Sequence, residues 1–422
     1  MPNLHPKKRI GFFAQTSSLG GADFYLGDIL TNLDYSTYSA IFFCNSTNPL
    51  LNDVLIRPLI AQKKLKIVIV CHDNPTISLS SDTHVEKPLE SLRPSTKASI
   101  LELAPVSLKL FLGTSREILR LIRIFKSNPV DLICFNDTGC EPAAIAAHLA
   151  RIPHVIGTYH VLPDDEPKST TWAHRLIEWF SVRSIHLGIS VSQATKTAWV
   201  KRTGVNPNNL KVIYNGIHLE KFSKTYDVHQ IKEGLAIPAE KIIIGIPARL
   251  HAMKGHQYLL EGVSQFRNQL PNTIVLIVGS GELRCSLEAM VDKLDIKQYI
   301  QFLGYRSDVN RIISIFDFAV FPSVALETFG LAAVECMATG KAVIASDFGG
   351  FPEVIKNGVT GILVKPRDSK ALGEAIVKLI NDPELCRRMG TAGKERAERL
   401  FSIDRMLTET FQLYEEVLYG KV

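Results

Sequence analysis

The sequence predicts an α/β protein built from two doubly wound parallel sheets. Its 422 residues exceed the roughly 250–300 residues at which a single core usually stops growing, so we expect two domains. Short apolar runs alternate with helical stretches, and this alternation predicts parallel strands joined by helical crossovers. The pattern starts again in the second half of the chain, which predicts a second sheet of the same kind.

Composition and charge narrow the class of partner. Apolar residues make up 46% of the chain and charged residues 21%, which is typical of a globular protein. The first 202 residues carry 22 Lys and Arg against 17 Asp and Glu, and the remainder carries 26 against 25. The excess of basic over acidic residues is too small to indicate a nucleic-acid partner, which usually requires a strong basic stripe. A mildly basic first half fits an acidic substrate, a phosphate-rich surface or an anionic membrane.

Cysteine usage and the apolar runs indicate a cytoplasmic protein. The cysteines are odd in number and form no Cys-x-x-Cys pair, so we expect neither a zinc knuckle nor a disulfide framework. The N-terminal apolar run over 10–14 is shorter than the core of a signal peptide, and no run reaches the roughly 18 residues of a membrane helix. Peripheral contact with the inner face of a membrane is left open. The seven cysteines are Cys44, Cys71, Cys134, Cys140, Cys285, Cys336 and Cys386.

The strand pattern defines two candidate domains. The opening strand is followed by a loop over 15–21, and a polar stretch over 74–99 reads as a surface excursion. In open α/β sheets a ligand lies beyond the carboxyl ends of the strands, so two such domains predict a cleft between them. We expect strands over 9–14, 40–44, 66–71, 132–135, 154–158, 187–191, 211–214, 242–247, 273–278, 300–303, 318–321, 341–345 and 361–364, and helices over 117–126, 142–150 and 405–418.

The segment from Phe321 to Gly340 has the strongest functional pattern. A strand ends at Phe321, a loop carries Glu327, and a helix begins at Leu331, with Glu335 in its second turn. Free amides at the start of this helix can bind phosphate, and carboxylates can accept hydrogen bonds from sugar hydroxyls. The alternative is that both are ordinary charged residues: Glu327 would be a charge in a loop, and Glu335 would face solvent on the helix. The helix is otherwise apolar, however, so a carboxylate at Glu335 needs a partner.

This segment resembles the two-glutamate signature of glycosyltransferase family four, in which seven residues separate the glutamates. The stretches over 246–255, 342–353 and 357–361 are also similar to that family. The resemblance covers nearly the whole second half and is looser in the first. It implies the GT-B fold, in which two Rossmann-like domains face a cleft. The acceptor would bind residues 1–203 and the nucleotide sugar residues 204–402, and a C-terminal helix over 403–422 would cross back to the first domain.

The resemblance implies that Arg249 and Lys254 clamp the diphosphate of the donor. Both follow the strand over 242–247, so they emerge at the carboxyl end of the sheet. Two cations there can neutralise the charge that builds on the departing nucleoside diphosphate, a task otherwise given to a metal. The alternative for these residues is an ordinary pair of surface cations. No metal site is implied.

The same resemblance assigns roles to the acidic segment. Glu335 would hold the ribose hydroxyls, Glu327 would bind the transferred sugar, and the backbone of Phe329, Gly330 and Leu331 would meet the distal phosphate or the sugar. Glu327 could also stabilise positive charge in an oxocarbenium-like transition state. Neither glutamate is assigned as a nucleophile, because front-face attack and a short-lived ion pair both remain open.

Two features of the first half match the family. Gly20 and Gly21 lie in the loop after the opening strand, where the family has a glycine-rich loop near the phosphates and the acceptor, although two glycines also make an ordinary turn. His160 follows the strand over 154–158, where the family commonly has a histidine aimed at the donor sugar and the acceptor. A histidine that caps a loop or fills a polar niche is the alternative.

Other patterns favour a structural interpretation. Gly279-Ser-Gly281 begins like a dinucleotide fingerprint, but Arg284 stands where the third glycine is needed, so no NAD site and no cofactor is expected. The acids over 164–166 are flanked by prolines and read as a solvated loop rather than a metal site. His218 stands where the family usually has an acid, at a junction that shapes the hinge.

One helix has a basic face. Thr114 to Glu117 resembles a capping box that opens a helix, along which Arg116, Arg120 and Arg123 share one side. Packing of this helix on its sheet with the cations in water is the favoured interpretation. Contact with an anionic bilayer is the alternative.

The sequence therefore predicts a retaining, metal-independent hexosyltransferase of polysaccharide biosynthesis. It would move a hexose from a nucleotide-diphosphate sugar to a hydroxyl of a glycan, glycolipid precursor or small molecule. A sugar-nucleotide epimerase or a phosphorylase of the same fold is one alternative. A catalytically silent sugar-nucleotide-binding scaffold is another, and the presence of Arg249, Lys254, Glu327 and Glu335 argues against it.

Overall fold

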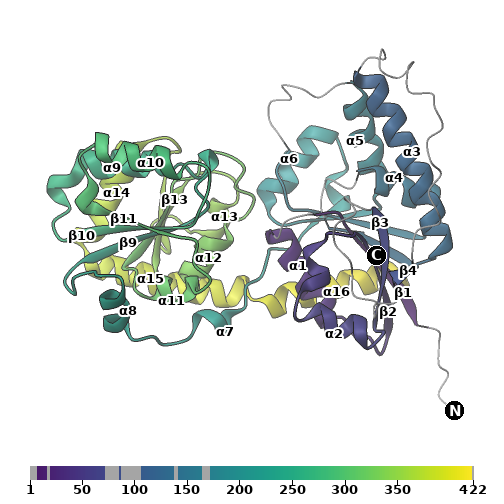
Figure 1. Ribbon diagram of the computed structural model, residues 1–422, viewed down its shortest axis with the longest axis horizontal. Coiled ribbons are helices and arrows are strands. Elements are labelled where there is room, and N and C mark those ends of the chain that lie inside the picture. Colours follow the sequence, from purple (N-terminus) through teal and green to yellow (C-terminus); the bar gives the residue numbers. More distant parts are fainter. Residues whose placement is uncertain are drawn as a thin grey trace. The chain divides into compact units, whose positions relative to one another are not determined.

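The chain folds into two compact units, each built on one parallel sheet (Figure 1). The computed structural model describes residues 7–16, 20–71, 85–86, 106–136, 141–163 and 172–420. The first unit comprises Met1–Val191, Thr195–Ile213 and Leu407–Val422, and the second comprises Ser192–Ala194 and Tyr214–Met406.

The first unit contains an eight-stranded sheet in the order β4-β3-β2-β1-β5-β6-β7-β8, with every pair parallel. The central strands are buried apolar runs, as a parallel sheet covered on both faces requires. The strands are β1 (Lys8–Ala14), β2 (Tyr38–Asn45), β3 (Leu65–Cys71), β4 (Val85–Glu86), β5 (Leu132–Phe135), β6 (His154–Tyr159), β7 (Leu187–Ser190) and β8 (Leu210–Val212).

Helices cover both faces of this sheet. Phe13 and Phe43 pack their rings against Phe125 of α3 on one face, at centroid distances of 6.2 and 5.3 Å. Phe12 packs against Tyr414 of α16 on the other face, at 6.4 Å. Successive residues of β1 therefore face opposite helical layers (Figure 1). The helices are α1 (Gly21–Asn32), α2 (Ile56–Ala61), α3 (Val106–Ser127), α4 (Glu141–Leu149), α5 (Trp172–Ser184), α6 (Gln193–Thr203) and α16 (Ile403–Tyr419).

The second unit contains a six-stranded parallel sheet in the order β11-β10-β9-β12-β13-β14. Ile244 and Ile246 of β9 face one apolar cluster, and Ile243 faces another on the opposite side. The strands are β9 (Ile242–Pro247), β10 (Thr273–Val278), β11 (Ile300–Gly304), β12 (Phe318–Phe321), β13 (Ala342–Ser346) and β14 (Gly361–Val364).

The helices of the second unit form two layers. Apolar residues of α9, α10 and α14 cover one face of the sheet, and those of α8, α11 and α12 cover the other (Figure 1). The helix α15 contributes to both clusters, with Met389 in the first and Ala397 in the second. The helices are α7 (Leu219–Phe222), α8 (Val228–Gly234), α9 (His256–Phe266), α10 (Arg284–Lys293), α11 (Val309–Ser314), α12 (Leu331–Ala338), α13 (Phe351–Val354), α14 (Ser369–Asn381) and α15 (Pro383–Leu400).

The units divide at residues other than those the sequence suggested. The first segment was expected to end at 203, but β8 pairs in parallel with β7, so the chain belongs to the first sheet as far as Ile213. The strand over 211–214 is thus part of the first sheet rather than the second. The final helix was expected over 403–422, crossing back to the first domain. The helix α16 does begin at Ile403 and the chain from Leu407 onward belongs to the first unit, so the division falls inside this helix, between Met406 and Leu407.

The start of α3 is a second difference. The helix begins at Val106, so the sequence from Thr114 to Glu117 lies inside it and does not cap it. The expected surface excursion over 74–99 lies outside the described residues apart from β4, and the acids over 164–166 lie outside them altogether. None of the helices in the described part of the chain has the length and hydropathy needed to cross a bilayer.

Each sheet has one place where the strand order reverses. In the first sheet the chain runs outward from β1 through β2 in one direction and from β5 through β6 in the other. In the second sheet it runs from β9 to β10 on one side and from β12 to β13 on the other. Ligands of doubly wound folds bind at such points because the adjacent loops diverge there. The loops after β9 and β12 therefore define the candidate site of the second unit.

Candidate active site

Lys254 and Glu327 lie together at the point where the strand order of the second sheet reverses. Lys254 ends the short 3₁₀ helix Ala252–Lys254 after β9, and Glu327 lies in the loop after β12. Because β9 and β12 are neighbours, the two loops meet, and Lys254 Nζ lies 2.8 Å from Glu327 Oε2. Glu327 is only 8% exposed. A carboxylate removed from water in this way needs charged or hydrogen-bonding partners, and Lys254 supplies one.

Ser323 is the second partner of this carboxylate. Its buried hydroxyl donates to Glu327 Oε2 at 3.0 Å. Ser323 was not among the residues predicted from the sequence, although it lies only four residues before Glu327. Serine and lysine together hold one oxygen of the carboxylate in place.

The backbone around Glu327 is held by the loop after β13. Leu326 has a φ of +50°, which is uncommon for a residue with a side chain and is typical of a constrained functional loop. Gly349 has a φ of +59°, and a Cβ atom there would lie 2.0 Å from the carbonyl oxygen of Glu327. The Gly350 N–H donates to that same carbonyl oxygen at 2.9 Å. Glycine at 349 therefore permits a close approach that fixes the position of Glu327.

The expected backbone site at the start of α12 has a defined geometry. Gly330 precedes the helix with a φ of +99°, and its carbonyl accepts the first helical bonds from Ala333 and Val334. The amides of Leu331 and Ala332 come before those bonds, so they are among the unpaired donors that an α-helix presents at its N-terminus. Phe329 points its ring into the core between Tyr214 and Phe401. Only the backbone of Phe329 is thus available to a ligand.

Glu335 lies on α12 and is partly buried. Burial raises its pKa to about 7, while the positive charge of Lys221 acts in the opposite direction. Arg249 is exposed, two residues beyond the end of β9. Among the described residues, neither Arg249 nor Glu335 hydrogen-bonds to the Lys254–Glu327 pair. The structure thus joins two of the expected residues directly and places the other two on the loop and helix that follow the same strands.

The Gly279-Ser-Gly281 turn supports the loop that carries Arg249. It follows β10, the other neighbour of β9, and Ser280 accepts a hydrogen bond from the Leu250 N–H at 2.9 Å. This hydrogen bond holds the turn after β10 against the loop that carries Arg249. In the described ranges no group of three or more His, Cys, Asp or Glu side chains is arranged as metal ligands would be.

In the first unit, Gly20 and Gly21 lie at the reversal point of the sheet. Gly20 is the N-cap of α1, and its N–H donates to Asp23 Oδ2 at 2.8 Å. Asn136, directly after β5, donates from Nδ2 to the Ala22 carbonyl at 2.8 Å. The first turn of α1 and the loop after β5 are therefore tied together. Residues 17–19 of the first loop lie outside the described part of the chain.

His160 follows β6 and is buried against α1. Its ring lies 4.9 Å from that of Tyr25, in an edge-to-face arrangement. Nε2 of His160 has no hydrogen-bond partner among the described residues. Burial lowers the pKa of His160 to about 3, so the imidazole is neutral at physiological pH. Tyr25 was not foreseen, because only tertiary packing brings α1 to the end of β6.

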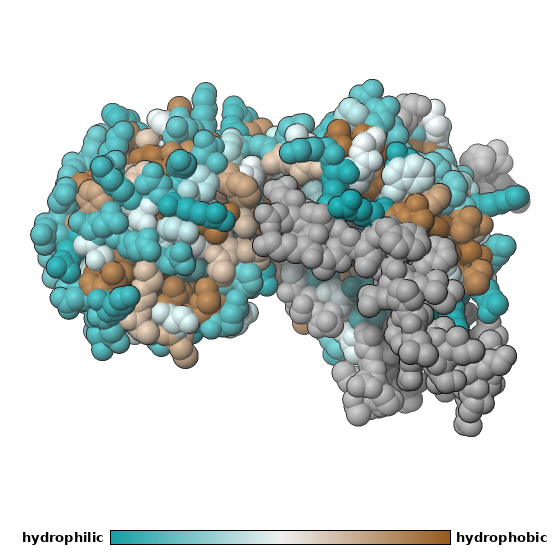
Figure 2. Space-filling model, turned by 90° about the horizontal axis from the view of Figure 1, so that it is seen from above, coloured by the Kyte–Doolittle hydropathy of each residue, from teal (hydrophilic) through white to brown (hydrophobic). Residues whose placement is uncertain are grey.

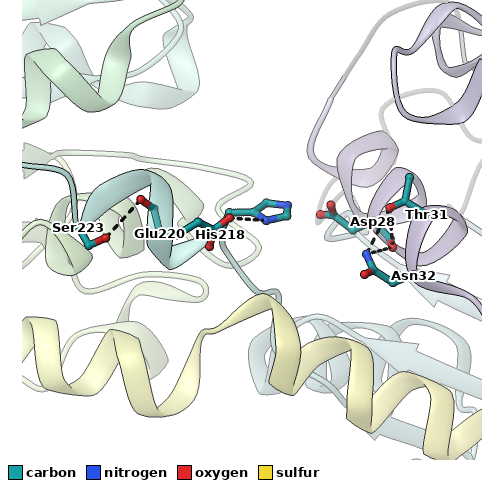
Figure 3. A network of polar contacts seen from close by, with 6 residues as sticks. All are labelled: Asp28, Thr31, Asn32, His218, Glu220 and Ser223. Atoms are coloured by element: carbon teal, nitrogen blue, oxygen red, sulfur yellow. Dashed lines mark hydrogen bonds and ion pairs between the residues drawn. The ribbon is translucent and has the colours of Figure 1, made fainter.

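His218 has an acidic neighbour of its own. Its Nδ1 lies 3.1 Å from Oε1 of Glu220, and the Ser223 hydroxyl donates to the Glu220 carbonyl at 3.3 Å (Figure 3). An acid is thus present two residues after the position where the family usually has one. Figure 3 also shows α1, where the side chains of Thr31 and Asn32 donate to the Asp28 carbonyl.

Two family models match most of this chain. Residues 227–396 match the glycosyl transferases group 1, and residues 99–221 match Glycosyltransferase Family 4. With two Rossmann-like parallel sheets, the protein has the architecture of a GT-B glycosyltransferase. The chain belongs to the glycosyltransferases of the group 1 and family 4 type.

Several known proteins are similar to it. The UDP-Gal:α-D-GlcNAc-diphosphoundecaprenol α-1,3-galactosyltransferase of Escherichia coli is 26% identical over 72% of this chain and 80% of its own length. The N-acetyl-α-D-glucosaminyl L-malate synthase of Bacillus anthracis is 30% identical over 51% of this chain and 56% of its own. The crystal structure of Anabaena HepE with UDP has a TM-score of 0.72 and 22% identity, and the match covers 97% of this chain and all of HepE. These relatives are consistent with transfer from nucleotide sugars.

Proposed function

We propose that this glycosyltransferase moves a hexose from a nucleoside-diphosphate sugar to a hydroxyl acceptor, with retention of configuration and without a protein-bound metal. The observation that carries the proposal is the Lys254–Glu327 ion pair at the reversal point of the second sheet. A cation and a carboxylate at that point can contact, respectively, a leaving diphosphate and the sugar attached to it.

The proposed chemistry follows from these charges. The bond between the anomeric carbon and the diphosphate oxygen breaks, and the acceptor oxygen forms the new bond on the same face. The proton of the acceptor hydroxyl passes to the departing diphosphate. Arg249 and Lys254 neutralise the charge that develops on this leaving group, and Glu327 stabilises the positive charge on the sugar. Glu335 accepts hydrogen bonds from the ribose.

The first unit supplies the remaining groups in this proposal. The exposed backbone of Gly20 and Gly21 permits close approach of a phosphate or an acceptor. The neutral imidazole of His160 has a ring nitrogen, Nε2, that bonds to none of the described residues and can hydrogen-bond to a sugar hydroxyl.

A uridine nucleotide is our first choice for the donor. HepE was crystallised with UDP and with UDP-glucose, and the E. coli relative is named for UDP-Gal. That relative is also named for a lipid-diphosphate acceptor, which supports a glycan or glycolipid precursor as the acceptor here.

A thermal-shift screen of UDP, GDP and ADP sugars tests the donor, because a ligand that binds only the folded state stabilises it. Transfer is then measured with the selected donor and a panel of glycan and lipid-linked acceptors, in the presence and absence of EDTA. Proton NMR of the product reports the anomeric configuration. An inverted product, or loss of activity in EDTA that Mg²⁺ restores, would contradict the corresponding part of the proposal. Epimerised sugar formed from donor alone would favour the epimerase.

A further inference from the structure

The second unit contains a pocket at the edge of its sheet opposite the candidate active site. The pocket has a volume of about 300 Å³, at the lower end of the range that is usual for small-molecule sites. Its wall is formed where β9, β12 and β13 begin, together with the end of α14 and the start of α15. The loops that carry Lys254 and Glu327 follow β9 and β12. The pocket therefore lies at the amino ends of the strands whose carboxyl ends define the candidate active site.

Most of the pocket wall is apolar. Phe316, Phe318 and Leu379 are almost completely buried in the fold and form its inner part. On the face of the second unit that Figure 2 shows, hydrophobic residues are scattered among hydrophilic ones. The pocket instead gathers apolar side chains in one concave place, which suits the apolar part of a ligand. The apolar residues of the wall are Ile242, Phe316, Phe318, Leu379, Ile380 and Pro383.

Lys341 adds a positive charge to this apolar wall. Its ammonium group has three donors, and among the described residues Nζ donates one hydrogen bond, to the Ser314 carbonyl at 2.8 Å. Burial lowers the pKa of Lys341, while the negative charge of Asp317 acts in the opposite direction. No carboxylate in the described part of the chain forms an ion pair with it. Because a cation removed from water needs partners, Lys341 can donate to an anion in the pocket.

The other polar groups of the wall are engaged or neutral. Asp317 Oδ2 accepts a backbone N–H of β9 at 2.7 Å, which holds this carboxylate against the sheet. The guanidinium of Arg387 binds both carboxylate oxygens of Glu384, at 2.7 and 3.0 Å. Burial raises the pKa of Cys386 to about 11, so its thiol is neutral at physiological pH. Lys341 is therefore the group that selects the charge of a ligand, and it selects an anion.

We propose that this pocket binds a small organic anion, whose carboxylate or phosphate accepts hydrogen bonds from Lys341 and whose apolar body packs on Phe316, Phe318 and Leu379. A neutral apolar ligand would leave donors of Lys341 without a partner. A small inorganic anion would leave the apolar wall in contact with water. A ligand with both parts satisfies both. This inference is independent of the reaction proposed above, because no residue of the pocket belongs to the candidate active site.

Ligand-observed NMR with the full chain tests the proposal, with phenylacetate and phenyl phosphate as the probes. Phenylacetamide has the same ring without the charge, and acetate has the charge without the ring. We expect saturable binding of phenylacetate or phenyl phosphate. The two controls should bind at least about tenfold more weakly, the factor that a hydrogen bond to a charged group usually contributes. Equal binding of phenylacetate and phenylacetamide, or no saturable binding of either anionic probe, would overturn the proposal.

Matched variants assign the binding to Lys341. Lys341→Met keeps the length of the side chain and removes its charge, so it should weaken binding of the anionic probe on the order of tenfold or more. Lys341→Arg keeps the charge and should retain more of the binding. The control is Lys378→Met, since Lys378 is an exposed residue of α14 outside the pocket, and it should bind like wild type. Equal affinity of wild type and Lys341→Met, with an unchanged thermal midpoint, would contradict the proposal.

Cys386 reports where the probe binds in the unaltered chain. Its thiol lines the pocket, so alkylation at Cys386, followed by peptide mass spectrometry, should slow as the probe saturates. Exposed Cys285 lies outside the pocket and should keep its rate of alkylation. Saturating UDP should not displace the probe, because the proposed donor site lies at the other edge of the sheet. Displacement by UDP without protection of Cys386 would place the probe in the donor site and overturn the inference. Protection of Cys386 that persists with UDP would support it even in a chain without transfer activity.

Discussion

Lys254 and Glu327 are 73 residues apart in sequence, and their side chains form an ion pair of 2.8 Å between Nζ and Oε2. Lys254 keeps 26% of its side chain exposed, whereas Glu327 keeps 10%. The lysine can therefore reach a phosphate while the carboxylate stays sheltered. This asymmetry supports the proposed roles, in which Lys254 contacts the leaving group and Glu327 contacts the sugar.

Replacing Glu327 by Ala should separate binding from catalysis. Nucleotide affinity should stay close to wild type, because in the proposed site Arg249 and Lys254, not Glu327, contact the diphosphate. Transfer should fall on the order of a hundredfold or more, the usual effect of removing one group that stabilises developing charge. Initial rates and calorimetric titration with the nucleotide measure the two quantities. Glu374→Ala, in an exposed pair with Lys370, is the control and should change neither. Unchanged transfer in Glu327→Ala would remove Glu327 from the site.

Replacing Gly349 by Ala should displace the Glu327 backbone. The new Cβ atom would lie 2.0 Å from the Glu327 carbonyl oxygen. Gly358→Ala is a matched control, since Gly358 also has a positive φ, of +76°, but has open space around it. Both variants should lose on the order of 1–2 kcal/mol for the left-handed backbone. Only Gly349→Ala should lose more stability and most of its transfer activity, as chemical denaturation and rate assays would show. Equal losses would mean that the contact does not position Glu327.

Glu335→Gln should change the dependence of stability on pH. The raised pKa, about 7 in the fold against an ordinary 4.5, means that the folded chain binds the proton more tightly than the unfolded chain. The free energy of unfolding therefore falls as the pH rises through this window. Gln cannot ionise, so it should stabilise the second unit on the order of 1–3 kcal/mol at pH 8 and leave it unchanged at pH 4.

The same substitution should weaken donor binding, because an amide has one acceptor oxygen where a carboxylate has two. Denaturation at pH 4 and pH 8, together with nucleotide titration, measures both effects. The control is Glu398→Gln, an exposed residue of α15. A stability gain that is the same at both pH values would show that Glu335 does not carry the titration.

His160 should contribute to acid sensitivity. Burial lowers its pKa to about 3, below the ordinary 6.5, so the unfolded chain binds a proton that the fold excludes. Stability of the first unit should therefore be complete above pH 6.5 and be lost progressively as the pH falls toward 3. His160→Gln should flatten this decline in thermal midpoint, whereas exposed His229→Gln should not. Parallel declines in wild type and His160→Gln would contradict the assignment.

The strands of the second sheet could be predicted from sequence to the residue in several cases. The runs over 242–247, 273–278, 318–321 and 361–364 coincide with β9, β10, β12 and β14. Each is an apolar, mostly buried run followed by a turn or loop, which leaves little freedom in where the strand ends. Lys254 and Glu327 could be placed near each other for the same reason, because both follow such strands.

Features that depend on distant packing could not be predicted in this way. A local pattern such as Thr114 to Glu117 looks the same inside α3 as at a helix start, so the true start at Val106 was missed. The sequence of β8 does not indicate which sheet the strand belongs to. Only its parallel pairing with β7 shows that it belongs to the first sheet. The contact between Tyr25 and His160 brings α1 to the end of β6, and no pattern of residue spacing in the sequence predicts it.

Both side-chain bonds to Glu327 fall on the same oxygen, Oε2. These two contacts restrict the rotation of the carboxylate in the folded chain. In the proposed reaction Oε1, for which the described residues provide no side-chain donor, is the oxygen that accepts a hydrogen bond from the sugar. The entropy of ordering this group is then not lost again in each catalytic cycle. Loosening Oε2 by a change at Ser323 would slow turnover even though the carboxylate itself remained intact.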